Sequence, residues 1–518
     1  FTVRFPATSK YKFVDFDLQR IDLQIFLDEK KSLLERNKLG QFATPSPLAK
    51  EIVQETLKIF DQKNIKLLEP SVGTGSFILN LLDSLPLDTN IEKIIGVEKD
   101  PLYGEASKEF YENILIDLNY IISDFTDLEP VEKVNLILAN PPYVRHHYIS
   151  NKLELVGKVL DKTGIKLSGL SGLYIYFILL SHDWLEDGGI ACWLIPSEFL
   201  DVNYGKKLKD YLLKDVTTLK IHRFDTAQSK FSDALVSSAV VWYKKNPPPL
   251  NHQINFTFGE SISDPIISKK VNSEDLVNES KWSRFPQNDI RKDTGEPRLK
   301  DYFRISRGIA TGENTFFILT KDEVIERNLP FDQFRPILPR PKDLESLHIQ
   351  SDSVGLPIVE KQLFVLNTLL TIKKIKEIYP TLYEYLEEGI KREVNQRHLC
   401  KTRKFWYYQE QRKSSLFYCS YIGRAKDSGK SPFKFIYNES KAIVNNSYLI
   451  LYPLPNLEEV LNKYPQLASK IISCLNNLDA SFMTDEGRIY GGGMQKMEPK
   501  ELGNVNANAI AKLIANEI

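Results

Sequence analysis

The sequence predicts an α/β protein whose first domain is built on an open, mostly parallel sheet. Short apolar segments at 67–69, 93–98 and 134–138 are too brief for helices, and polar, glycine or proline residues follow each of them. The segment 78–85 between two of these strands reads as an apolar helix, which is the strand and helix alternation typical of such sheets. After residue 249 the segments become shorter and mixed, so we expect a second domain of mixed α and β structure.

Two helices are expected before the first strand. Residues 14–36 carry apolar side chains among charges at approximately helical spacing. A turn at 39–45 precedes a second helix at 47–60, and Thr44 with Pro45 forms a plausible start for that helix.

Composition places the chain among ordinary globular proteins. Its 518 residues suffice for two or three domains, and 42% of them are hydrophobic and 26% charged. The four cysteines, Cys192, Cys400, Cys419 and Cys474, lack the paired spacing of zinc sites or a disulfide framework, so we expect no metal. No apolar run approaches membrane-spanning length and no signal peptide begins the sequence, which predicts a cytoplasmic protein without membrane contact.

The tetrapeptide Asn140-Pro141-Pro142-Tyr143 follows a buried strand and is the strongest candidate for chemistry. Ligands bind at the carboxyl ends of strands in open α/β sheets. Asn140 offers a side-chain carbonyl and Pro141 a backbone carbonyl, and both prolines hold the loop because their φ is fixed. Two such acceptors would bind both N–H groups of an aromatic amine and direct its lone pair at an incoming methyl group, while Tyr143 stacks on the flat base. The alternative is a plain turn after a strand, and Asn246-Pro247-Pro248-Pro249, which lacks the aromatic residue, reads as such a linker.

Three further strand ends carry residues suited to an adenosine-like ligand. The turn 71–76 contains Gly73 and Gly75 and leads into a helix, so a ligand could approach the backbone closely there. Glu98 ends the next strand about twenty residues later, where a carboxylate can bind ribose hydroxyls. Asp124 could accept a hydrogen bond from an adenine amino group beside Phe125, although an acid in such a turn is often only a local cap.

This ordered set of motifs resembles the gamma-class adenine-N(6) DNA methyltransferases, the TaqI-like amino-methyltransferases. Segments 172–177, 185–189 and 190–196 resemble the family's next helix, turn and strand. The resemblance implies a Rossmann-like, S-adenosylmethionine-dependent domain with a mostly parallel seven-stranded sheet, followed by a C-terminal target-recognition domain. We therefore expect a catalytic domain with its helical lead-in at 1–245, a linker and entry segment at 246–300, and the recognition domain at 301–518.

The resemblance also implies roles for single residues. Phe42, Thr44, Glu69, Gly73, Gly75, Glu98, Asp124 and Phe125 would contact S-adenosylmethionine. Phe231, five residues before a second apolar segment, matches the aromatic residue that packs on the flipped base opposite Tyr143. An aromatic residue in that context is also typical of a core.

A basic and aromatic segment at 391–426 is the candidate DNA-binding region, with ten Lys or Arg against two Glu. The residues that we expect to contact DNA are Arg397, Lys401, Arg403, Lys404, Trp406, Tyr407, Arg412 and Lys413. The alternative is a solvated charged face over a small core. Net charge cannot decide between them because 68 basic residues balance 68 acidic ones. Segments 307–316 and 487–494 resemble the opening and the closing part of the family's recognition domain.

The function implied by the resemblance is transfer of a methyl group from S-adenosylmethionine to a flipped adenine in double-stranded DNA, within a restriction-modification or host-protection system. We expect a monomer without a fused nuclease, and a separate restriction endonuclease as a candidate cognate enzyme. The alternatives are methylation of RNA or of a protein glutamine, which usually involves no large recognition domain, and a non-catalytic DNA-binding subunit.

Overall fold

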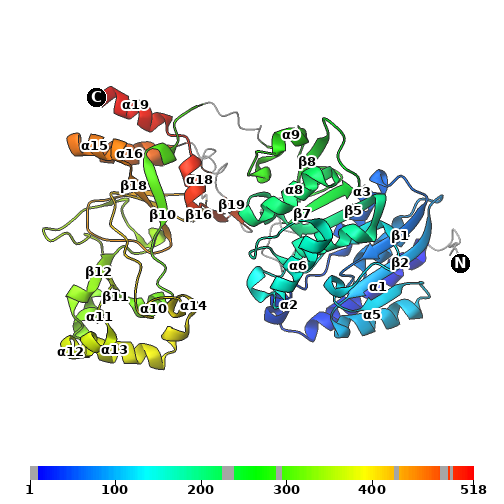
Figure 1. The fold of residues 1–518 in the computed structure, drawn as a ribbon, viewed down its shortest axis with the longest axis horizontal. Helices are drawn as coiled ribbons and strands as arrows, with labels where there is room; N and C mark the ends of the chain where they lie inside the picture. The colour runs from blue at the N-terminus through cyan, green and yellow to red at the C-terminus, as the bar shows by residue number, and fades with distance from the viewer. Residues whose placement is uncertain are drawn as a thin grey trace. The chain divides into compact units, whose positions relative to one another are not determined.

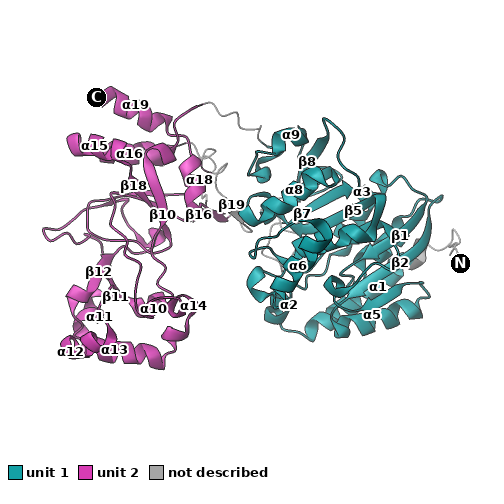
Figure 2. Ribbon diagram, in the orientation of Figure 1, with its two compact units in different colours: residues 1–292 teal, residues 293–518 magenta. Residues whose placement is uncertain are grey.

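The computed structural model describes residues 10–224, 238–287, 295–424, 431–478, 483, 488–490 and 494–517 (Figure 1). Contacts divide the chain into two compact units, Phe1–Lys292 and Asp293–Ile518 (Figure 2). In the described ranges, no helix is both long and apolar enough to cross a bilayer.

Unit 1 alternates strands and helices along the chain. Its strands are β1 (Asn64–Glu69), β2 (Asn90–Glu98), β3 (Asn119–Ile122), β4 (Val134–Ala139), β5 (Leu185–Pro196), β6 (Thr217–Phe224), β7 (Ser238–Lys244), β8 (Gln253–Gly259) and β9 (Ile267–Asn272). Its helices are α1 (Lys10–Glu29), α2 (Leu33–Leu39), α3 (Ser46–Ile59), α4 (Ser76–Ser84), α5 (Pro101–Asn113), α6 (Lys152–Thr163), α7 (Leu173–Leu180), α8 (Lys206–Lys214) and α9 (Ser273–Leu276).

The nine described strands of unit 1 form one sheet in the order β3-β2-β1-β4-β5-β7-β6-β8-β9. β1 pairs in parallel with β2 and with β4, β4 pairs in parallel with β5, and β7 runs antiparallel between β5 and β6. The Rossmann-like fold class is therefore confirmed, and the first seven strands of this order make up the expected seven-stranded sheet.

The expected linker at 246–300 needs correction. β8 and β9 lie within it and add two strands to the same sheet, with β8 parallel to β6. The unit boundary falls after residue 292 rather than 245. Residues 246–249 connect β7 to β8 inside unit 1, which the proline-rich composition alone could not reveal because prolines end a strand in either case.

Helices cover both faces of the sheet. Successive residues of a strand point to opposite faces, so each strand contributes side chains to two cores. Leu67, Leu136 and Cys192 face a core made with α3, α4 and α5. Leu68, Ile137 and Trp193 face a second core made with α6, α7 and α8. Burial on both sides explains why the strand segments read as continuous apolar runs.

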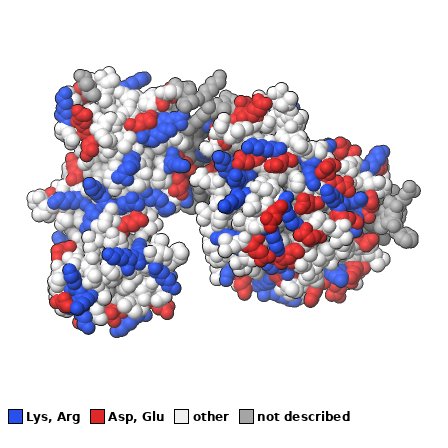
Figure 3. Space-filling model, in the orientation of Figure 1, with Lys and Arg blue, Asp and Glu red and all other residues white. Residues whose placement is uncertain are grey.

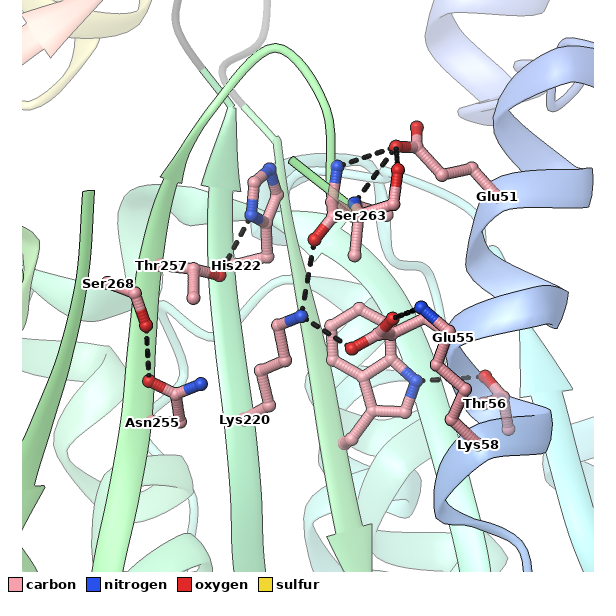
Figure 4. Close-up of polar contacts among 12 residues, drawn as sticks. Glu51, Glu55, Thr56, Lys58, Lys220, His222, Asn255, Thr257, Ser263 and Ser268 are labelled. Atoms are coloured by element: carbon pink, nitrogen blue, oxygen red, sulfur yellow. Dashed lines mark hydrogen bonds and ion pairs between the residues drawn. The ribbon is translucent and has the colours of Figure 1, made fainter. Parts of the chain in front are cut away.

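Polar contacts attach α3 to β6, to β7 and to the segment that follows β8 (Figure 4). The Nζ atom of Lys220 on β6 donates to Glu55 at 2.7 Å, and both side chains are largely buried. Trp242 of β7 donates its indole N–H to the Thr56 hydroxyl at 2.8 Å. Glu51 accepts hydrogen bonds from backbone and side-chain groups of residues 261–263. These contacts fix the position of α3 relative to the sheet. They thereby also fix the position of the segment immediately before it.

The N-terminal lead-in is two helices rather than the single helix expected at 14–36. The chain leaves the helical conformation after Glu29, and a capping box restarts it at Ser32. The Ser32 hydroxyl accepts from the Glu35 N–H, and the Glu35 carboxylate accepts from the Ser32 N–H at 2.9 Å. Such a box satisfies two of the unpaired N–H groups at a helix start, so it marks a boundary that hydrophobic spacing alone conceals.

Unit 2 is mixed, as expected. Its described strands are β10 (Phe303–Arg307), β11 (Ile318–Thr320), β12 (Phe334–Ile337), β13 (His348–Ile349), β14 (Leu363–Leu366), β15 (Phe417–Ser420), β16 (Ile422–Arg424), β17 (Phe435–Asn438), β18 (Tyr448–Pro453), β19 (Arg488–Tyr490) and β20 (Met494–Lys496). Its described helices are α10 (Asn314–Phe317), α11 (Lys321–Glu326), α12 (Ile372–Ile378), α13 (Pro380–Lys391), α14 (His398–Lys401), α15 (Pro455–Lys463), α16 (Leu467–Asn476), α18 (Pro499–Asn504) and α19 (Asn508–Glu517). The strands form a five-stranded sheet, β10-β18-β15-β17-β13, and two three-stranded sheets.

Candidate active site

A cavity of about 410 Å³ opens at the carboxyl ends of β1, β2 and β4. Residues directly after these strands line it, together with the segment 39–44 and one face of α1. The parallel strands bring these distant segments together because their carboxyl ends meet at the same edge of the sheet.

Asn140 lines this cavity and its amide is held from one side. The Nδ2 atom donates to the Phe42 carbonyl at 2.8 Å and to the Thr44 hydroxyl at 3.0 Å. Ser71 donates to the backbone carbonyl of Asn140 at 2.9 Å. Among the described residues, none donates to Oδ1. The side-chain carbonyl is therefore left to accept a hydrogen bond from a ligand.

The rest of the tetrapeptide is anchored to its surroundings. Pro142 lines the cavity and Pro141 is buried. The Tyr143 N–H donates to the Gly40 carbonyl at 3.3 Å, and its phenol donates to the Leu194 carbonyl at 3.2 Å. Burial raises the pKa of this phenol, so it stays a neutral donor. Tyr143 and Phe42 have ring centroids 6.0 Å apart at an angle of 43°.

Gly40 is the point where the N-terminal segment meets this loop. Its φ is +68°, which an L side chain rarely adopts, and an added Cβ would lie 2.4 Å from the Tyr143 nitrogen. Gly40 could not be identified from the sequence, because only the fold brings residues 40 and 143 together.

The two glycines of the turn play different roles. Gly73 has open space where a Cβ would lie and it lines the cavity, which fits the expected ligand contact. An added Cβ at Gly75 would lie 2.0 Å from the Tyr111 hydroxyl oxygen, which donates to the carbonyls of Thr74 and Gly75. Gly75 therefore shapes the loop beside Tyr111, and the ligand contact expected for it stays a prediction.

Two carboxylates face the cavity from β1 and β2. Glu69 is 3% exposed, and its Oε2 atom is buried without a hydrogen-bond partner. Burial raises the pKa of Glu69 well above its ordinary value, while Arg20 acts in the opposite direction. Burial likewise raises the pKa of Glu98, although its carboxylate accepts from the backbone N–H groups of Gly73 and Asp100 at 3.0 Å and 2.8 Å.

Asp124 makes two local contacts at the end of β3. One oxygen of Asp124 accepts from the Thr126 N–H at 2.9 Å and caps a short 3₁₀ helix, and the other pairs with Lys99 at 2.7 Å. Burial raises the pKa of Asp124, but the hydrogen bonds from Lys99 and Thr126 outweigh it and the pKa is lowered. The local cap is therefore present, and the contact of Asp124 with the cofactor adenine stays a prediction. Phe125 does line the cavity, packed against Phe177 with ring centroids 5.2 Å apart.

Several lining residues were missed by sequence reasoning. Asp100 accepts from Lys31, and also from Gln41 at 2.7 Å, which ties β2 to the N-terminal lead-in. Arg20, Gln24 and Asp28 of α1 line the cavity from one helix face. The available signal in the sequence was their spacing, because polar residues four positions apart lie on the same face of a helix.

Of the expected DNA contacts in unit 2, that of Tyr407 is corrected because its side chain is buried, while those of Trp406 and Arg403 stay predictions. Tyr407 is 2% exposed and donates to the Leu370 carbonyl, and Trp406 packs against Phe316 with ring centroids 5.7 Å apart. Arg403 donates to the carbonyls of residues 310 and 311, and burial lowers its pKa. Tyr407 therefore belongs to a core, whereas Trp406 and Arg403 pack at its edge and remain partly exposed. The dense mixture of basic and aromatic residues in the sequence could not distinguish these positions.

The other predicted contacts lie at the surface of unit 2. Lys401, Lys404 and Lys413 are exposed. Arg397 pairs with Glu313 at 3.1 Å and Arg412 with Glu410 at 2.9 Å. On the face shown in Figure 3, lysine and arginine side chains outnumber acidic ones across the middle of this unit.

Phe231 lies outside the described residues, as does part of segment 487–494. Within the described ranges, no group of three or more His, Cys, Asp or Glu residues could hold a metal ion.

Comparisons with known proteins match both units. Residues 45–231 match the family model of the Eco57I restriction-modification methylase, and residues 281–517 match that of the Type II methyltransferase M.Eco57I, C-terminal domain. The Type II methyltransferase M.AccI of Acinetobacter calcoaceticus is 29% identical over 495 residues, which cover 91% of this chain and 85% of that protein. M.XamI of Xanthomonas campestris pv. amaranthicola is 24% identical over 487 residues, which cover 92% and 86%.

Among solved structures, the Type IIL restriction-modification enzyme MmeI in complex with DNA aligns with a TM-score of 0.49 and 12% identity, covering 88% of this chain and 63% of that one. The two family models together match most of the sequence, on either side of the unit boundary. Residues 45–231 and 281–517 are therefore each similar to a domain of the Eco57I-type restriction-modification methyltransferases.

Proposed function

We propose that this protein transfers a methyl group from S-adenosylmethionine to the exocyclic amino group of an adenine in double-stranded DNA. The observation that carries the proposal is the orientation of Asn140, whose Nδ2 is occupied by Phe42 and Thr44 while Oδ1 is left free at the cavity. An acceptor fixed in this way suits an amine better than a carbonyl substrate, because it can bind only an N–H or O–H donor.

The lining residues fit the cofactor. Glu69 has a buried carboxylate oxygen without a partner, which suits a cationic group such as the ammonium of methionine. Glu98 lies at the end of β2, the position suited to ribose hydroxyls, and the phenyl ring of Phe125 lines the cavity beside the place expected for a purine. When bound, S-adenosylmethionine supplies an electrophilic methyl group.

The residues of the tetrapeptide prepare the amine. The lone pair of an adenine amino group is delocalised into the ring, so the nitrogen is a poor nucleophile. Hydrogen bonds from its two N–H groups to Asn140 Oδ1 and to the Pro141 carbonyl would localise that lone pair and direct it into the cavity. Tyr143, held by its bonds to Gly40 and Leu194, would stack on the base after the base has left the duplex.

The test is methyl transfer by the Asn140→Ala variant. We expect radiolabelled methyl transfer to duplex DNA to fall by about a hundredfold or more, the magnitude found when a preorganised hydrogen-bonding group is removed. Cofactor binding should persist, because the variant leaves Glu69 and Glu98 intact. Near-normal turnover in Asn140→Ala would refute the proposed role.

The substrate is tested by offering duplex DNA, RNA and protein in competition. Methylated adenine in the DNA fraction supports the proposal. Transfer to RNA or to a glutamine amide would identify the substrate of a different amino-methyltransferase, and no transfer to any of them would identify a non-catalytic subunit.

We further propose that the protein acts as a monomer beside a separate restriction endonuclease. The size of the complex on a DNA duplex, measured by light scattering, tests the first part. Protection of the methylated duplex from a cognate endonuclease tests the second.

A further inference from the structure

Helix α1 forms one wall of the active-site cavity. Arg20, Gln24 and Asp28 line it and, being four residues apart, share one face of the helix. All three precede residue 45, where the match to the methylase family model begins.

Arg20 is a buried cation with donors to spare. The side chain is 2% exposed, its Nε atom donates to Asp17 at 2.6 Å, and its Nη1 atom donates to the Thr74 hydroxyl at 3.1 Å. A guanidinium carries five N–H groups, and within the described ranges Nη2 makes no hydrogen bond. The Nη2 atom is therefore available to an acceptor, and the cavity that Arg20 lines is the open direction.

The glycine turn is attached to this arginine. Thr74 accepts from Arg20 and donates to Gln24 at 2.7 Å, so two residues of α1 hold the turn between Gly73 and Gly75. On β1, the unpartnered carboxylate oxygen of Glu69 lines the same cavity. One cavity therefore presents a guanidinium and a carboxyl group, which can together bind the two ends of a zwitterion.

We propose that Arg20 binds the carboxylate of the amino-acid end of the cofactor, opposite Glu69. The inference rests on the proposed function, because it assumes a ligand with a methionine moiety. Arginine suits this task because its planar fork donates two parallel hydrogen bonds to a carboxylate. Asp17 and Thr74 hold the fork in place before the ligand arrives, which reduces the entropy lost on binding.

The test compares two ligands that differ only in the amino-acid end. S-adenosylhomocysteine carries the carboxylate, and 5′-methylthioadenosine lacks the whole amino-acid end. We expect Arg20→Met to weaken S-adenosylhomocysteine binding about 10- to 100-fold, as for loss of a hydrogen bond to a charged group, and to leave methylthioadenosine binding unchanged. Calorimetric titration of the full chain measures both dissociation constants.

Two further variants keep the result interpretable. Arg20→Lys retains the cation beside Asp17 but not the fork, so a smaller loss is expected, again for S-adenosylhomocysteine alone. Lys209→Met is the matched control, since Lys209 is a second buried cation of unit 1 that donates to the carbonyls of residues 200 and 280 away from the cavity. Its removal should affect neither ligand.

The outcomes separate the two proposals. Wild-type protein that binds neither ligand would overturn the proposed function and this inference with it. Wild-type protein that binds both, with an equal loss or no loss of both in Arg20→Met, would overturn only the role of Arg20. A loss confined to the ligand with a carboxylate supports it.

Discussion

Asn140 is oriented by two residues that lie 98 and 96 positions before it in the chain, Phe42 and Thr44. An asparagine amide has a donor end and an acceptor end of nearly equal size, so its own packing would not select one orientation. The Phe42 carbonyl can only accept, and therefore it selects the donor end of the amide. At the scale of residues, this site is defined by donors that are already occupied and acceptors that are left free.

Thr44 is predicted to act as a positioning residue through Asn140. Thr44→Val keeps the shape of the side chain but removes the hydroxyl that accepts from Nδ2. We expect kcat to fall about tenfold, which corresponds to one lost hydrogen bond, while the dissociation constant of the cofactor stays the same. Thr44→Ser retains the hydroxyl and serves as the control. Weaker cofactor binding with an unchanged kcat would instead support the direct cofactor contact that the family resemblance implies.

Glu69 is predicted to make cofactor binding depend on pH. Burial raises its pKa above the ordinary 4.5, so the side chain of the free protein ionises only at higher pH. If the ionised carboxylate binds the ammonium group, affinity for S-adenosylhomocysteine should rise as pH increases through the pKa of the folded state. Titrations at a series of pH values above 4.5 should show this rise in wild type and not in Glu69→Gln.

The same shift has a consequence for stability with a definite sign. The folded state binds the proton of Glu69 more tightly than the unfolded state does. Stability of the ligand-free protein is therefore lost as pH rises from 4.5 through the folded pKa, and Glu69→Gln should reduce that loss. Greater stability of the wild type at the upper end of this range, relative to Glu69→Gln, would contradict this assignment.

At the scale of elements, α3 connects the active-site segment that precedes it to strand β6 of the sheet. It begins at Ser46, directly after the segment that holds Asn140, and it is attached to β6 by the pair of Glu55 and Lys220. Burial raises the pKa of Glu55, but hydrogen bonds from Lys220 and Lys58 outweigh it, so the pKa lies below its ordinary value and the carboxylate is charged.

Lys220→Met is predicted to destabilise unit 1 by about 3 kcal/mol, because it leaves a buried carboxylate without its closest cation. Lys58→Met is a matched control, since Lys58 contacts the same carboxylate from an exposed position and should cost less than about 1 kcal/mol. Urea unfolding measures both. Equal effects of the two substitutions would show that burial of the pair does not increase its contribution to the free energy of unfolding.

At the scale of the whole molecule, the two units have separate hydrophobic cores. The clusters of unit 1 lie between its sheet and its helices, and unit 2 has three clusters of its own. Separate cores favour separate unfolding transitions.

A cofactor ligand is predicted to stabilise only one of these transitions. S-adenosylhomocysteine at about 100 times its dissociation constant should add about 2.7 kcal/mol to the unit that binds it. Calorimetry of the full chain should then show a higher midpoint for the transition of unit 1 and an unchanged midpoint for that of unit 2. A shift of the unit 2 transition alone would contradict the location of the site.

Much of the first unit could be predicted from sequence because its signals are local. The apolar strands, the glycine turn and the proline-held loop each occupy fewer than about ten successive residues, and the strand order follows from a known architecture. Asp124 shows the limit of such reasoning, since an acid in a turn can cap the chain or bind a ligand, and only the structure shows its bonds to Lys99 and Thr126.

The basic and aromatic segment of unit 2 shows the same limit on a larger scale. Lys401 and Lys404 are exposed, whereas Arg403 between them is bonded to backbone carbonyls and Tyr407 is buried. Composition describes how many charges and rings a segment contains but not the direction in which each points.

The sequence alone determined the fold class, the edge of the sheet where the site lies, and the acceptors of the tetrapeptide. Tertiary structure alone decided which way Asn140 faces, that β8 and β9 extend the sheet, and that α1 closes the cavity with Arg20. The physical reason is the range of the interactions. Backbone preferences and hydrophobic periodicity act within a few residues, whereas the bonds that orient Asn140 and Arg20 join atoms that only the folded chain brings together.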